Sequence, residues 1–142
     1  MNQSDSDFFK ELISVFKIES EEHIQMMKKG LDEIENNSPE GTALDDILER
    51  VHRAAHSLKG AARTIGLSDI EPVCQAMESI FSVYKRKKIA PASEIIVLMQ
   101  QAVDQLGKIL LSINEEGQVV GDKSGLVRLM DEMNKQLSVM SE

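Results

Sequence analysis

The sequence predicts an all-α protein, an antiparallel up-down four-helix bundle with an additional fifth helix at its C-terminal end. Every long segment places apolar residues three and four positions apart, and none shows the sustained alternation of a β-strand. The three prolines and eight glycines mostly stand at the ends of these segments. With 142 residues the chain is long enough for one domain with a buried core, and we expect residues 1–142 to form it.

The first two helices are predicted over about residues 5–36 and 42–65. The segment between them, Asn-Asn-Ser-Pro-Glu-Gly, interrupts the apolar pattern and is typical of a turn. Gly66 follows the second helix, where a glycine in the left-handed conformation commonly ends a helix. The inner side of the first helix is expected to carry Phe9, Leu12, Phe16, Ile24, Met27, Leu31 and Ile34.

The third helix is expected to open at residues 68–71, Ser-Asp-Ile-Glu, which have the residue types of a capping box. It is expected to end at the basic run 85–88, because cations at a helix C-terminus complement its dipole. The fourth helix is predicted over about residues 91–114, which completes a bundle over about residues 5–114. After a break with two glycines, the additional helix is expected over about residues 122–141.

Composition excludes several function classes. The formal net charge of −8 and the absence of tryptophan argue against nucleic acid as a partner. No apolar run approaches the roughly 20 residues of a membrane-spanning helix, so no direct membrane insertion is expected. The N-terminus lacks the basic-then-apolar order of a signal peptide, and the single cysteine, Cys74, cannot form an internal disulfide. We therefore expect a cytoplasmic protein.

The second helix carries a basic segment within this acidic chain. Residues 50–63 contain Arg50, Arg53, Lys59 and Arg63 and no acidic residue. At about 100° per residue, the apolar side chains of this helix fall within one arc. The arc consists of Leu44, Ile47, Leu48, Val51, Ala55, Leu58, Ala62 and Ile65. Three of the four cations lie on the opposite side, so the segment is predicted to receive an acidic partner.

His56 lies roughly opposite the centre of the apolar arc and is predicted to face solvent or the edge of a neighbouring helix. Gly60 lies one turn later on the same face, although a glycine in a helix interior costs about 1 kcal/mol relative to alanine. It leaves bare backbone beside the imidazole, which would let another protein approach closely. Lys59 lies three positions after His56, from where its ammonium can reach an anion carried by the imidazole.

Residues 53–62, Arg-Ala-Ala-His-Ser-Leu-Lys-Gly-Ala-Ala, resemble the signature of histidine-containing phosphotransfer (HPt) domains, most of all the N-terminal phosphotransfer domain of CheA-type chemotaxis histidine kinases. The helix count fits the same family, so the resemblance covers nearly the whole chain. It implies that His56 is phosphorylated, that Lys59 contacts the phosphate and that Glu78 accepts a hydrogen bond from the imidazole. Glu78 stands at the edge of the apolar stripe of the third helix, a position from which a carboxylate can lean over an adjacent helix. Gln75 stands where members of the chemotaxis group can carry a second histidine.

The resemblance also implies the partners. A kinase ATP-binding domain, in the same or another chain, would supply the phosphoryl group from ATP with Mg²⁺. An aspartate of a response-regulator receiver domain with its own Mg²⁺ would accept it. Arg53, Gly60, Arg63 and Gln75 would then belong to the docking surface. The chain has no GxxxxGK[ST] loop, so we expect a monomeric phosphate carrier without a cofactor of its own, not a kinase acting alone.

Other interpretations remain open at this stage. The chain could be the N-terminal part of a chemotaxis kinase in a receptor-associated complex at the membrane, a stand-alone phosphorelay protein, or a non-catalytic helical interaction module. His52 and His56 are four positions apart, which suits one metal ion, but the segment offers no third ligand and Arg53 opposes a cation. We therefore expect no metal site. Cys74 falls near the apolar stripe of the third helix and is predicted to be a buried packing residue.

Overall fold

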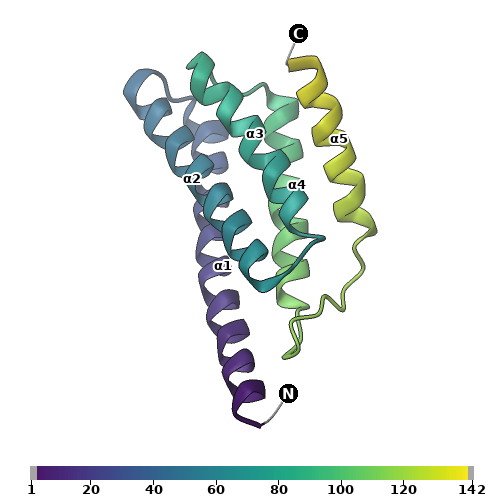
Figure 1. Ribbon diagram of the computed structural model, residues 1–142. Helices are drawn as coiled ribbons and strands as arrows, with labels where there is room; N and C mark the ends of the chain where they lie inside the picture. The colour runs from purple at the N-terminus through teal and green to yellow at the C-terminus, as the bar shows by residue number, and fades with distance from the viewer. Residues whose placement is uncertain (1–2, 141–142) are drawn as a thin grey trace.

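The computed structural model describes residues 3–140, which form five helices. These are α1 (Gln3–Asn37), α2 (Gly41–Ile65), α3 (Glu71–Lys87), α4 (Ser93–Leu111) and α5 (Ser124–Met140). Each helix runs antiparallel to the one before it (Figure 1). The described residues contain no β-strand, and one isolated bridge joins Ile113 to Val119 in the loop before α5. The predicted all-α bundle with an additional C-terminal helix is confirmed.

The helices enclose one apolar core. In the packing order, α2 lies between α1 and α3, α4 packs against α1, and α5 packs against both α3 and α4. Burial of apolar surface is the main favourable contribution to such a fold, and each helix turns its apolar stripe inward. The largest fully buried side chains come from all five helices and the loop before α3: Phe81, Met27, Leu31, Leu48, Leu58, Ile70, Met77, Ile80, Met99, Leu106, Leu126 and Leu129. No helix within residues 3–140 is long and apolar enough to cross a lipid bilayer.

The contact between α1 and α2 depends on a glycine that the sequence pattern did not single out. Gly30 is buried in α1, and a Cβ atom added there would lie 2.3 Å from Cγ1 of Val51 and 3.4 Å from Cγ2 of Ile47. The missing side chain therefore lets the two helices approach closely. This contact holds α2, which carries His56, against the rest of the bundle.

The N-terminal part of α1 differs from the prediction. Leu12 was expected on the inner side, but 37% of its surface is exposed, while Ile13 is buried. Leu12 lies five helical turns before Gly30, so it belongs to the side of α1 that faces α2. Figure 1 shows that α1 extends past the end of α2, so nothing from α2 covers the first turns of that side.

The turn between α2 and α3 confirms one predicted helix signal and corrects another. Gly66 ends α2 in the left-handed conformation, with φ of 86°, and its N–H donates to the carbonyls of Ala62 and Arg63. The predicted capping box at residues 68–71 is wrong, because α3 begins with Ile70 as the N-cap residue and no side chain caps it. The carboxylate of Glu71 instead accepts a hydrogen bond from Arg63 of α2.

Candidate phosphoacceptor site

His56 occupies the middle of α2 on the side away from the core. The apolar arc of this helix is buried, with Ile65 at its end only partly so. The imidazole side chain is 63% exposed, which agrees with its predicted place opposite that arc. A partner therefore has free access to the ring, while the backbone that carries it belongs to a buried helix.

Glu78 of α3 joins two side chains of α2. Its Oε1 lies 2.8 Å from Nδ1 of His56, and its Oε2 lies 2.6 Å from Nζ of Lys59. His56 and Lys59 are three positions apart, so they rise from neighbouring places on one helix face and reach the same carboxylate. The contact depends on the antiparallel packing of α2 and α3, which sets these residues opposite one another.

The surroundings of Glu78 determine which nitrogen of the His56 imidazole carries the proton. Burial opposes ionisation of this carboxyl group, whose side chain is 14% exposed, but the ion pair with Lys59 and the hydrogen bond with His56 outweigh burial and lower the pKa of Glu78. An ionised carboxylate only accepts hydrogen bonds, so Nδ1 of His56 must donate. Nε2 of the neutral ring is then left without a proton and carries the lone pair of a nucleophile.

Lys59 and Gln75 lie in the seam between α2 and α3. The Lys59 side chain is only 13% exposed, and its ammonium also donates to Oε1 of Gln75 at 3.0 Å. Nε2 of Gln75 donates in turn to the Ser79 hydroxyl at 2.9 Å. The resemblance implied a phosphate contact for Lys59 and a docking role for Gln75. In the structure Lys59 contacts Glu78 and Gln75, and Gln75 contacts Ser79.

The other cations of the basic segment are also paired. Arg53 contacts Glu49 one turn earlier on α2 at 2.9 Å, and Arg63 contacts Glu71 of α3 at 2.6 Å. Arg50 contacts a carboxylate of α1 at 3.3 Å. Acidic residues outside the segment 50–63 therefore pair with each of its cations, while the side chains of Arg53 and Arg63 remain mostly exposed. Docking of an acidic partner on this segment stays a prediction. Of these acids, only Glu49 could have been found from its helical spacing to Arg53.

Gly60 leaves open space beside the imidazole. It is exposed, and a Cβ atom built there would meet no heavy atom within 4 Å. This is the opposite of Gly30, where a Cβ atom would collide with α2. The absence of a side chain at residue 60 therefore serves no internal packing.

Two other candidate chemistries find no support. Within residues 3–140, no group of three His, Cys, Asp or Glu side chains is placed to hold a metal ion, and His52 and His56 gain no third ligand. Cys74 is fully buried, and burial raises the pKa of its thiol to about 12, so it is an unreactive packing residue.

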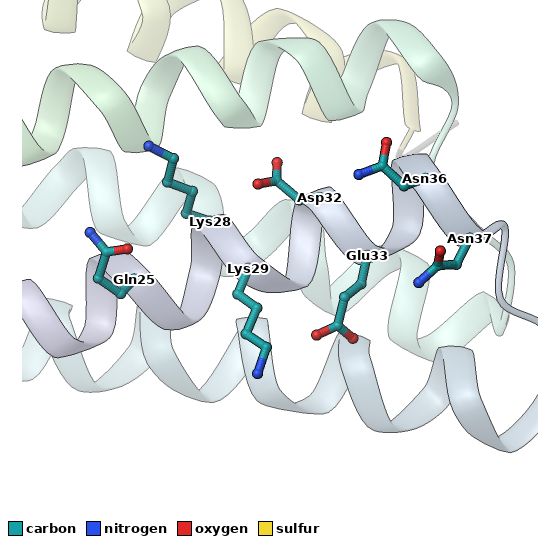
Figure 2. Close-up of a pocket in the computed structure, with 7 residues that line it drawn as sticks. All are labelled: Gln25, Lys28, Lys29, Asp32, Glu33, Asn36 and Asn37. Atoms are coloured by element: carbon teal, nitrogen blue, oxygen red, sulfur yellow. The ribbon is translucent and has the colours of Figure 1, made fainter.

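A surface hollow on the outer side of α1 does not gather side chains toward one point. Figure 2 shows Lys28 and Asp32 pointing toward one neighbouring helix and Lys29 and Glu33 toward the other. Several of these side chains already have partners within the bundle, since Asp32 accepts a hydrogen bond from Gln100 of α4 and Glu33 forms an ion pair with Arg50 of α2. The hollow is a solvated helix surface, and the seam around His56 remains the candidate site.

Comparison with known proteins agrees with this geometry. The family model described as Hpt domain matches residues 11–109. The chain belongs to the Hpt domain family. The matched region of this Hpt domain spans most of α1, all of α2 and α3 and nearly all of α4, so it includes His56, Lys59 and Glu78.

Among its relatives is the sensor histidine kinase CheAY of Helicobacter pylori, which is 25% identical over 135 residues, 95% of this chain and 16% of the relative. The chemotaxis protein CheA of Bacillus subtilis is 27% identical over 119 residues, 84% of this chain and 17% of the relative. The chain thus spans about a sixth of the length of these two relatives. A solved structure of the phosphorylated P1 domain of CheA3 in complex with CheY6 from R. sphaeroides has the same fold, with a TM-score of 0.77 and 20% identity. That alignment covers 92% of this chain and 98% of the P1 domain.

Proposed function

We propose that this Hpt domain carries a phosphoryl group on Nε2 of His56, receives it from ATP held by a kinase domain, and passes it to an aspartate of a response-regulator receiver domain. The observation that carries the proposal is the contact between Nδ1 of His56 and the ionised carboxylate of Glu78 at 2.8 Å. It provides an exposed nucleophile with a defined tautomer. The Hpt family membership and the kinship with chemotaxis kinases support the same assignment.

In the first step, the lone pair of Nε2 attacks the γ-phosphorus of ATP, and the bond from phosphorus to the oxygen of the leaving ADP breaks. The ring keeps its proton on Nδ1 and becomes positively charged. Glu78 accepts the hydrogen bond from that proton, so its negative charge stabilises the phosphorylated ring. We assign Lys59 as the cation that contacts the phosphoryl group, in addition to its hold on Glu78.

In the second step, a carboxylate oxygen of the receiver aspartate attacks the phosphorus, and the bond electrons from phosphorus return to Nε2. Phosphoryl transfer depends chiefly on in-line positioning and charge stabilisation, which the partner domains with their ATP and Mg²⁺ would supply. For this chain we propose docking through the exposed surface around His56, with Arg53, Gly60, Arg63 and Gln75 as its members. A cytoplasmic place beside the kinase and its receptors follows from this role.

The test is labelling with a CheA-type kinase domain and radiolabelled ATP, followed by addition of a receiver domain. Wild-type protein should gain label that resists base and is lost in acid, as expected for phosphohistidine, and should lose it to the receiver. His56→Gln should remain folded, because the side chain is exposed, and should gain no label. Normal labelling of a folded His56→Gln protein would refute the assignment.

A further inference from the structure

A polar cavity of about 340 Å³ lies beside the phosphoacceptor site. Its wall includes His52 of α2, Glu78, Ser82 and Arg86 of α3, and Leu137 of α5. Glu78 belongs both to this wall and to the contact with the imidazole, so the cavity begins where the phosphoacceptor is held. Arg86 stands two turns further along α3, roughly 12 Å from Glu78 along the helix axis.

Three side chains in the cavity wall carry hydrogen-bonding groups that have no partner among residues 3–140. Among residues 3–140, the guanidinium of Arg86 meets no carboxylate within 4.0 Å and makes no hydrogen bond. The hydroxyl of Ser82 and the ring of His52 likewise have no hydrogen-bond partner in that part of the chain. The neighbouring cations of the basic segment differ, because each of them already contacts a carboxylate.

The chemistry of this wall suits a carboxylate. Burial, followed by the nearby Lys85, lowers the pKa of His52, so its ring is a neutral hydrogen-bonding group near neutral pH. The negative charge of Glu78 is already balanced by Lys59. Arg86 therefore supplies the available charge, and a guanidinium binds a carboxylate with two parallel hydrogen bonds.

We propose that this cavity is a carboxylate-binding subsite for the receiver domain that takes the phosphoryl group from His56, with Arg86 as its anchoring cation. The proposal rests on the function proposed above. A receiver that is phosphorylated on an aspartate and holds Mg²⁺ with oxygen ligands has an acidic face around that aspartate, so a carboxylate of that face that does not hold the ion can meet Arg86. A typical protein interface covers about 800 Å² on each partner, so a receiver seated on His56 also reaches Arg86.

The experiment compares Arg86→Gln with Lys87→Gln in the full chain. Lys87 is the next residue of α3, is also exposed and unpaired among residues 3–140, and does not line the cavity. Both substitutions remove one positive charge at the same helix end. We expect Arg86→Gln to weaken receiver binding about tenfold in calorimetric titration, and Lys87→Gln to change it less than about twofold. Arg86→Lys keeps the positive charge but lacks the planar guanidinium, so its affinity for the receiver should lie between those of the wild type and Arg86→Gln.

Equal losses of receiver affinity from Arg86→Gln and Lys87→Gln would overturn the subsite in favour of a general positive field. No loss of affinity from either substitution would also overturn the subsite. If Arg86→Gln slows labelling by the kinase more than it weakens receiver binding, the occupant is the kinase domain and the receiver assignment is wrong. Labelling of His56 in the wild type is measured in the same series. Failure of that labelling refutes the proposed function, whereas normal labelling with unaltered receiver binding of Arg86→Gln refutes only the subsite.

Discussion

Two helical glycines should respond in opposite ways to the same substitution. Alanine is the better helix former by about 1 kcal/mol, and this intrinsic gain is the same for Gly30→Ala and Gly60→Ala. At Gly60 a Cβ atom meets nothing within 4 Å, so the whole gain should appear as stability. For a domain of this size, that gain corresponds to a rise in melting temperature of about 3 to 5 °C.

At Gly30 the added Cβ would lie 2.3 Å from Cγ1 of Val51, far inside van der Waals contact. Val51 is completely buried, and a β-branched side chain has little freedom at χ1, so the helices must move apart. Overpacking of this kind costs about 1 to 3 kcal/mol, which cancels or exceeds the helical gain. We therefore expect Gly30→Ala to lower stability by up to about 2 kcal/mol.

The assay is urea unfolding of both variants and the wild type, monitored by circular dichroism. Equal dependence of the unfolding free energy on urea concentration in all three proteins checks two-state behaviour. A Gly30→Ala protein as stable as Gly60→Ala would refute the close approach of α1 and α2.

A third variant extends the comparison to function. Gly60→Gln should keep at least the wild-type stability but slow transfer from His56 to the receiver, because its side chain fills the space one turn from the imidazole. Transfer at the normal rate would show that the bare backbone has no docking role.

Three further predictions concern the site and the core. Glu78→Ala should slow phosphorylation of His56 more than it slows onward transfer, because the lost Nδ1 partner leaves a mixture of tautomers; rapid-quench labelling measures both rates. The folded-state pKa of Glu78 is lowered, so its stabilising contribution is present above the ordinary glutamate pKa of about 4.3 and is lost as pH falls. The melting temperature of wild type should therefore exceed that of Glu78→Gln at pH 7, and the difference should shrink below about pH 4. Cys74 should resist thiol reagents in the folded protein and react once urea unfolds it.

Each of these three predictions has an outcome that contradicts it. An unaltered phosphorylation rate in Glu78→Ala would reduce this carboxylate to a surface group. A stability difference from Glu78→Gln that stays constant down to pH 3 would show that ionisation of Glu78 does not support the fold. Labelling of Cys74 at the rate of an unfolded control would show that the thiol is accessible.

The sequence alone determined the features that depend on neighbours along one helix. Helical periodicity is local, so the apolar arc of α2 and the exposed place of His56 opposite it could be predicted from residue spacing. The glycine at the end of α2 was predictable for the same reason, because the left-handed conformation at Gly66 is a property of that one residue. The residues from Arg53 to Ala62 were enough to indicate the Hpt family.

Tertiary structure decided which side chains meet across the helices. The contact of Glu78 with His56 and Lys59 depends on the register between α2 and α3, which no spacing within either helix specifies. The same register brings Glu71 to Arg63, whereas the sequence had predicted Glu71 as the last residue of a capping box. Arg86, which the sequence placed in the basic run at the end of the third helix, lines a cavity only because α2 and α5 stand beside it. The sequence shows where the charged residues stand along the chain, but the packing of helices decides which opposite charges pair with them. The surface that meets a partner could therefore not be predicted from the charge pattern alone.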